Sequence, residues 1–213
     1  MAYRMEHIDC VYYMNLDHRT DRRTQIEEEL DKLKVPEAKR IRIPGVNKPG
    51  FGILGCGLAH KKTIETFLAS NHKTCLIFED DFEFTLDMEY VHFLLNAIFE
   101  ENIQFDCIML AGCILETKPT EYPFLQKVIN VHTASAYLIT KEFAPVLLES
   151  YTESTNLLED TYKETGEKNI SYHNDIWWKR YQPYFNWFIL NPRLGEQRFS
   201  FSDNLQRDLK YGF

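Results

Sequence analysis

The chain has 213 residues, 44% of them hydrophobic and 26% charged, which is the composition of an ordinary soluble globular protein. Its formal net charge of −8, with no long Lys/Arg stripe, argues against a nucleic-acid partner. No stretch approaches the length of a transmembrane helix, and residues 1–7 lack the apolar core of a signal peptide. We therefore predict a cytoplasmic protein without a membrane span.

Cysteine usage supports this prediction. The five cysteines include no CxxC pair, and three of them lie inside apolar, strand-like runs. An odd number in such positions favours reduced thiols in a cytosolic compartment over a disulfide framework.

Strand-like and helix-like segments alternate along the first half of the chain. Apolar runs predict strands at residues 8–16, around 41–43, at 74–78 and at 106–110. Helical spacing of apolar residues predicts helices from Thr20 or Asp21 to about residue 33, at 58–70 and at 87–100. This alternation is typical of an α/β domain with a largely parallel sheet.

The second half has a less regular pattern. We predict strands at 128–131, 136–140 and 187–190, a helix at 141–151 and a short helix at 173–181. Residues 152–173 are polar and loop-like, and the tail from Asn191 has no regular pattern. Because there is no repeat or low-complexity linker, we expect one domain over residues 1–213.

Three consecutive acids, Glu79, Asp80 and Asp81, end the apolar run at residues 76–78. Crowded carboxylates repel one another and are costly to desolvate, so a hard divalent cation would stabilise them. The triplet alone fits an acidic turn equally well, but ligands of open α/β sheets bind at the carboxyl ends of strands, which favours a site. Alternation along a strand would point Glu79 and Asp81 one way and Asp80 the other.

Two other segments could bind a phosphate or a nucleotide. Residues 15–23 are polar and cationic directly after the first strand, and their arginines could donate to phosphate or simply lie on a solvated helix start. Five glycines between Gly45 and Gly57 could let the backbone approach a ligand, or form a tight loop before the helix. His60, in the first turn of that helix, is either a site residue or a packed core histidine.

Two candidates lie late in the chain. Asp175 begins a segment rich in tryptophan, where it could act as an acid or base or only cap a helix. Residues 197–203, from Gln197 to Asp203, form a polar cluster in the tail.

In chain order, these segments resemble glycosyltransferase family 25, which contains bacterial lipooligosaccharide galactosyltransferases and collagen galactosyltransferases. The matching residues are Asn15, Leu16, Arg19, Arg22, Arg23, Gly55 to His60, Ile77 to Asp81, Ala136 to Thr140, Asp175, Gln197, Ser202 and Asp203. The resemblance implies a GT-A-type α/β fold, with a mostly parallel central sheet flanked by helices and a DXD-type motif at residues 79–81. It also implies that the chain is the amino-terminal glycosyltransferase domain of a larger chlorella-virus protein in the host-cell cytoplasm.

The implied activity is metal-dependent transfer of a sugar from a UDP-sugar donor to a hydroxyl of a glycan or glycoprotein. Residues 1–115 would form the nucleotide-binding half and residues 116–213 the acceptor-side half. Asp81 and Glu79 would bind Mn²⁺ or Mg²⁺, because an all-oxygen site suits these ions and not zinc. The donor would be bound by a second group of residues: Asn15, Leu16, Arg19, Arg22, His60, Asp80 and Gln197.

If transfer inverts the anomeric centre, a general base must deprotonate the acceptor, and we expect Asp175 to be that base. A retaining mechanism would not need it. Two other functional classes remain open. One is a metal-dependent nucleotidyltransferase or phosphoesterase, and the other is a non-catalytic UDP-sugar-binding module.

Overall fold

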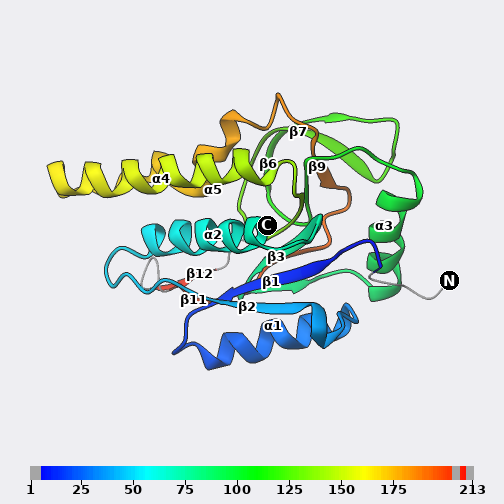
Figure 1. Cartoon of the computed structure of the whole chain (residues 1–213), viewed down its shortest axis with the longest axis horizontal. Helices are drawn as coiled ribbons and strands as arrows, with labels where there is room; N and C mark the ends of the chain where they lie inside the picture. Colours follow the sequence, from blue (N-terminus) through cyan, green and yellow to red (C-terminus); the bar gives the residue numbers. More distant parts are fainter. Residues whose placement is uncertain (1–5, 203–206, 210–213) are drawn as a thin grey trace.

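A computed structural model describes residues 6–202 and 207–209 of the chain (Figure 1). Its centre is an eight-stranded sheet in the order β2-β1-β3-β8-β5-β9-β7-β6. The strands are β1 (Cys10–Asn15), β2 (Arg40–Pro44), β3 (Thr74–Glu79), β5 (Cys107–Met109), β6 (Cys113–Pro119), β7 (Leu125–His132), β8 (Ala136–Thr140) and β9 (Trp187–Leu190). The α-helices are α1 (Thr20–Lys32), α2 (Gly52–Ala69), α3 (Met88–Glu100), α4 (Ala144–Thr165) and α5 (Asn174–Trp177).

Helices cover both faces of the sheet, as predicted for an α/β fold. Side chains of β1 alternate between two cores, with Val11 in one and Tyr12 in the other. The first core receives α1 and α3, for example through Leu30 and Leu94, and the second receives α2 and α4. Figure 1 shows α2 and α4 on one side of the sheet and α1 on the other. Strands buried on both faces explain the continuous apolar runs in the sequence.

The α/β fold is confirmed, but the central sheet is mixed, so the prediction that it is mostly parallel is wrong. Strand β1 pairs in parallel with β2 and β3, and β5 pairs in parallel with β9. The remaining pairs, β3–β8, β5–β8, β7–β9 and β6–β7, are antiparallel. Strands β6 and β7 are neighbours joined by only residues 120–124, and parallel neighbours would need a longer crossover.

Helix α4 extends to Thr165, so the prediction of a loop at residues 152–173 is wrong for its first part. The buried face of α4 includes the small polar residues Ser150, Ser154 and Thr155, which gave the sequence its loop-like character. These residues allow α4 to lie close to α2: a Cβ placed on Gly57 would lie 3.0 Å from Thr155 Cγ2. The helix ends at Gly166, which has a left-handed φ of 73°.

Helix α2 begins at Gly52, six residues earlier than predicted, so Gly52, Gly55 and Gly57 are helical. A Cβ on Gly55 would lie 2.3 Å from the carbonyl oxygen of Val46. The close approaches at Gly55 and Gly57 are therefore to the chain's own backbone and to α4, and the prediction of a loop over these glycines is wrong.

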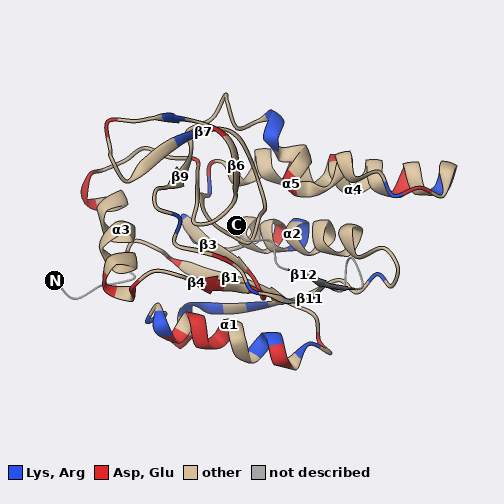
Figure 2. Ribbon diagram, turned by 180° about the vertical axis from the view of Figure 1, so that it is seen from behind, with Lys and Arg blue, Asp and Glu red and all other residues tan. Residues whose placement is uncertain are grey.

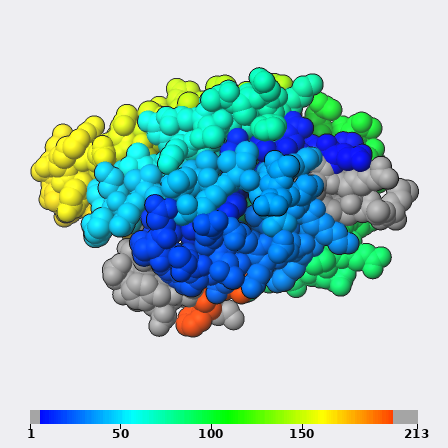
Figure 3. All heavy atoms as spheres, turned by 60° about the horizontal axis from the view of Figure 1, so that its bottom comes forward, coloured from blue at the N-terminus to red at the C-terminus, as the bar shows by residue number. Residues whose placement is uncertain are grey.

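The tail is more regular than predicted. Strand β10 (Gly195–Gln197) pairs antiparallel with the short strand β4 (Phe82–Phe84), and β11 (Ser200–Ser202) pairs with β12 (Arg207–Leu209). The space-filling view shows α1 and β2 forming one outer face, with the last described part of the tail at its edge (Figure 3). Asp203 lies outside the described residues. Within the described ranges, no helix is both long and apolar enough to span a membrane.

Candidate functional site

The acidic triplet lies where β3 ends beside β1. The two strands are parallel and in register, so Glu79 lies opposite Met14 and next to Asn15. Asn15 Nδ2 donates to Asp80 Oδ2 at 2.7 Å. From α1, Arg22 Nη1 lies 3.0 Å from Asp80 Oδ1 and 3.2 Å from Asp81 Oδ2. Basic and acidic residues alternate along this helix (Figure 2), and Arg22 is the one that reaches the triplet in the contacts described.

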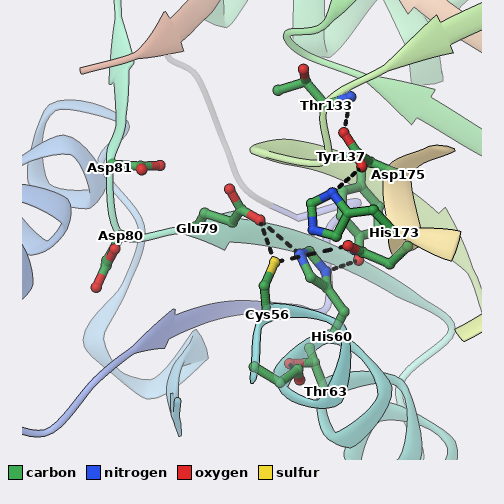
Figure 4. A network of polar contacts seen from close by, with 12 residues as sticks. Cys56, His60, Thr63, Glu79, Asp80, Asp81, Thr133, Tyr137, His173 and Asp175 are labelled. Carbon is green, nitrogen blue, oxygen red and sulfur yellow. Dashed lines mark hydrogen bonds and ion pairs between the residues drawn. The ribbon is translucent and has the colours of Figure 1, made fainter. Parts of the chain in front are cut away.

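The three acids divide between two directions. Strand β3 ends at Glu79, and Asp80 and Asp81 follow in a turn. Glu79 and Asp81 both accept from Gln197 Nε2, at 3.1 and 3.4 Å, whereas Asp80 is held by Asn15 and Arg22. Figure 4 shows the side chains of Asp80 and Asp81 pointing away from each other. Pairing of β10 with β4 is what brings Gln197 from the tail to this point.

Glu79 is held from behind by a buried chain of polar groups. Its Oε1 lies 2.9 Å from His60 Nε2 and 3.4 Å from Cys56 Sγ. His60 Nδ1 lies 2.8 Å from the hydroxyl of Tyr137, which in turn accepts from the Tyr151 hydroxyl at 3.1 Å. If Tyr137 donates to Nδ1, the hydrogen on Nε2 can be donated to Glu79, so every group in the chain is satisfied. The chain fixes one oxygen of Glu79 and leaves Oε2 facing Gln197 and Asp81.

The pKa values of the triplet separate in opposite directions. Burial would raise the pKa of Glu79, but the hydrogen bond and charge of His60 lower it overall. Burial raises the pKa of Asp81 to about 7, because Arg22 offsets only part of this effect and Glu79 and Asp80 add repulsion. The pKa of Asp80 is also raised, chiefly by burial. A cation bound at this turn would favour the ionised forms of Asp80 and Asp81.

Asp175 lies on the other side of Glu79. The turn between β7 and β8 joins the two regions, because Ser135 O accepts from Glu79 N at 2.8 Å. In the same turn, Thr133 N donates to Asp175 Oδ2 at 2.9 Å. His173 Nδ1 lies 2.6 Å from Asp175 Oδ1, and His132 Nδ1 lies 3.8 Å from Oδ2. The N-cap of α5 is His173, so the alternative role of Asp175 as helix cap is wrong.

This environment stabilises the Asp175 anion. Burial alone would raise its pKa, but the charge and contact of His173, the Thr133 N–H and the charge of His132 lower it to about 2. Conversely, burial would lower the pKa of His173, while attraction to Asp175 and Glu79 raises it.

The other predicted residues occupy less direct positions. His60 is fully buried with both ring nitrogens engaged, so it lies behind Glu79 and not on a surface open to a donor. Leu16 is half-buried, and its carbonyl accepts from Arg19 N at 2.9 Å. Arg19 forms an ion pair with Asp21 at 2.8 Å, and its carbonyl accepts from Asn15 Nδ2.

Several residues in these contacts had been given no site role: Cys56 and Tyr137, which lie in segments that match the family, and His132, Thr133, Tyr151 and His173, which do not. For His173, its place two residues before Asp175 was the available signal. The contacts of Tyr137 and Thr133 could not be read from the sequence, since their partners lie 77 and 42 residues away in the chain.

Two sets of side chains could hold a metal. Glu79 Oε2 and Asp81 Oδ1 meet at the Gln197 amide, and these hard oxygen donors fit Mn²⁺ or Mg²⁺. The donor atoms of Cys56, His60 and Glu79 all lie within 4.8 Å of one another, as sulfur, nitrogen and oxygen ligands that suit a softer ion such as Zn²⁺. The hydrogen bonds of His60 and Cys56 to Glu79 give this second set a role without a metal.

No family model and no curated protein matches the sequence. Solved structures with a similar arrangement include one described as a mannose-1-phosphate geranyltransferase from Thermus thermophilus (12% identity, TM-score 0.47, covering 92% of this chain and 76% of that chain). Others are A197 from STIV (11%, 0.47, 95% and 93%) and a glycosyltransferase involved in glycosylation of the major capsid of PBCV-1 (9%, 0.38, 85% and 93%). At these identities and scores, the similarities are to overall arrangement alone.

Proposed function

We propose that the chain is a metal-dependent glycosyltransferase that moves a sugar from a UDP-sugar donor to a hydroxyl of a glycan or glycoprotein acceptor. One observation carries the proposal. Glu79 and Asp81 share the Gln197 amide at the carboxyl end of β3, and Asp175, an aspartate with a lowered pKa, lies on the other side of Glu79. Two half-buried carboxylates that could bind a cation, beside a second acidic centre, suit transfer between a charged leaving group and a neutral hydroxyl.

We further propose roles for the surrounding residues. Asn15, Leu16, Arg19 and Arg22 would cradle the nucleotide within a nucleotide-binding half at residues 1–115, and Asp80 would contact the ribose or donor sugar. Residues 116–213 would form the acceptor side. Membership in glycosyltransferase family 25, a cytoplasmic location and further domains in a longer polypeptide are part of the same proposal.

The metal would neutralise charge that develops on the leaving diphosphate as the anomeric bond breaks. Asp81 would be its main protein ligand and Glu79 the second, with Gln197 ordering both carboxylates. His60 keeps Glu79 ionised and turned toward Asp81. Arg22 holds Asp80 and Asp81 in place and adds positive charge near the phosphates.

The test is a screen of UDP-sugars with Mn²⁺, with analysis of the released products. We expect UDP and slow sugar release without acceptor, and loss of both in Asp81→Ala. Glu65→Ala, which changes an exposed acid on α2, is the matched control and should retain both. Release of UMP or pyrophosphate would instead identify a nucleotidyl enzyme. Binding of UDP-sugar without turnover of any acceptor would identify a binding module.

A further inference from the structure

Three groups converge on the carboxylate of Asp175, and they leave it little freedom. Thr133 N donates to Oδ2, and His173 Nδ1 lies 2.6 Å from Oδ1. Thr133 has a φ of 82°, an uncommon conformation for a β-branched residue, and this conformation accompanies the N–H contact to Asp175. Asp175 is 9% exposed. Oδ2 therefore accepts a hydrogen bond and Oδ1 lies in an ion pair, and these two contacts fix the orientation of the carboxylate.

The short contact determines which ring nitrogen of His173 carries hydrogen. The contact is an ion pair, since Oδ1 has no partner that meets hydrogen-bond geometry, but two lone pairs at 2.6 Å would repel each other, so Nδ1 carries the hydrogen. In the neutral ring, Nε2 then has a free lone pair. An acid that holds Nδ1–H and leaves Nε2 available is the arrangement by which a carboxylate orients a histidine base.

Nε2 of His173 is also a buried polar atom without a hydrogen-bond partner. In Figure 4, the imidazole extends from Asp175 toward the group formed by Glu79, His60 and Cys56. The charge of Glu79 acts on His173, which agrees with this placement. A buried polar atom with no partner, directed at a group that contains the Glu79 carboxylate, points to a ligand that binds there during function.

We propose that His173 Nε2 accepts the proton of the acceptor hydroxyl and that Asp175 is a positioning residue for His173, in place of acting as the base itself. The inference rests on the proposed function, and it assigns the proton transfer within that reaction to a different atom.

In this step, the acceptor oxygen forms a bond to the anomeric carbon of the donor. The bond from that carbon to the β-phosphate oxygen breaks, and its electron pair leaves with UDP. The hydroxyl proton passes to Nε2 and gives an imidazolium. The hydrogen on Nδ1 stays on that nitrogen, facing Asp175. Release of that proton to water restores the neutral ring.

The electrostatic surroundings support His173 over Asp175. With a pKa of about 2, Asp175 is too weak a base to take a hydroxyl proton efficiently near neutral pH. The charged groups that act on His173 or on its partner Asp175 are Glu79 of β3 and His132 of β7, and Lys179 acts on His132. Asp175 and Glu79 raise the pKa of His173, which makes it the stronger base.

The experiment compares His173→Asn with Asp175→Asn and His132→Asn. The Asn side chain in His173→Asn can still donate to Asp175 but has no group at the Nε2 position. We expect its turnover number to fall by roughly 100-fold or more, in the range of general-base effects. Affinity for UDP with Mn²⁺ should stay within about threefold, since no diphosphate contact is removed. His132→Asn should lose much less, because His132 lies 3.8 Å from Asp175.

The pH profile separates a catalytic role from a structural one. Turnover of the wild type should fall at low pH as His173 becomes protonated. Asp175→Asn removes the partner that raises the pKa of His173, so the acid limb should move to lower pH while the maximal rate falls. Thermal unfolding checks that each variant folds, and where His173→Asn does not fold, the Asp175→Asn profile decides.

Wild-type turnover in His173→Asn would overturn the inference, and so would an acid limb at the same pH in Asp175→Asn and the wild type. Neither result would contradict the proposed glycosyltransferase function. A product with retained anomeric configuration also overturns it, since that chemistry needs no base. If the wild type turns over no UDP-sugar, the proposed function fails and the inference fails with it.

Discussion

Asp81 is half-buried and Asp175 buried, both near Glu79, yet their pKa values move in opposite directions. Burial raises the pKa of Asp81 to about 7, whereas His173, Thr133 and His132 overcome burial and lower the pKa of Asp175 to about 2. At Asp81, one arginine is shared between two aspartates. At Asp175, three groups serve one carboxylate. The comparison teaches that Asp81 has less positive charge around it than Asp175 has, which is why the proposed cation is placed beside Asp81.

We expect the largest effect on activity from removing the charge of Asp81. Asp81→Asn keeps the shape of the side chain but removes the charge, and we expect Mn²⁺-dependent transfer to fall by at least about 100-fold. Calorimetric titration of UDP should then lose its dependence on Mn²⁺. Equal Mn²⁺-dependent binding in the variant and the wild type would show that the metal lies elsewhere.

The same substitution should stabilise the metal-free protein. A carboxylate with a raised pKa loses its proton first in the unfolded chain, so its contribution to stability falls between about pH 4 and pH 7. Asp81→Asn avoids this loss, and we expect a gain above pH 7 on the order of a few kcal/mol. Chemical unfolding from pH 4 to 8 in the presence of chelator measures it. A variant no more stable than the wild type at pH 8 would contradict the charge shortage.

Asp175→Asn should have the opposite effect on the free energy of unfolding and destabilise the protein. The lowered pKa of Asp175 contributes stability above about pH 4, which is lost as the pH falls toward 2. We expect the variant to be about 2 kcal/mol less stable than the wild type at pH 7, with the difference shrinking in acid. Unfolding curves at pH 7 and pH 3 test this. Identical curves at pH 7 would mean that the histidine contacts do not stabilise the anion.

We expect the smallest effect from a substitution of Gln197, whose amide contacts both Glu79 and Asp81. Gln197→Ala removes the amide that orders both carboxylates but leaves their charges. Affinity for Mn²⁺, followed by electron paramagnetic resonance, should weaken by less than about tenfold, a typical cost for a group that orients metal ligands. A loss as large as that of Asp81→Asn would make Gln197 a ligand itself.

How far the sequence predicts the molecule depends on how local the determinant is. The segments that form β1 and β3 are apolar and end in Asn15 and in the acidic triplet. Each segment therefore predicted a strand, the residue where the strand ends, and the candidate site residues at that end. Helix α4 was missed because its buried face carries serine and threonine where it meets Gly57, a tertiary contact invisible in a local window. The same limit hid Tyr137 and Thr133, whose partners are distant in the chain. His173 was missed because only the fold shows that Nδ1 contacts Asp175.

The pairing of β10 with β4 has a consequence for how the protein can vary. The eight-stranded sheet is complete at Leu190, and Gln197 reaches the triplet only through a two-stranded ribbon outside that sheet. Scaffold and chemistry are therefore partly modular. Substitutions in β10 or β4 would change the surroundings of Glu79 and Asp81 without changing the eight-stranded sheet. Under the proposed function, related chains could therefore differ in metal preference while keeping the same fold.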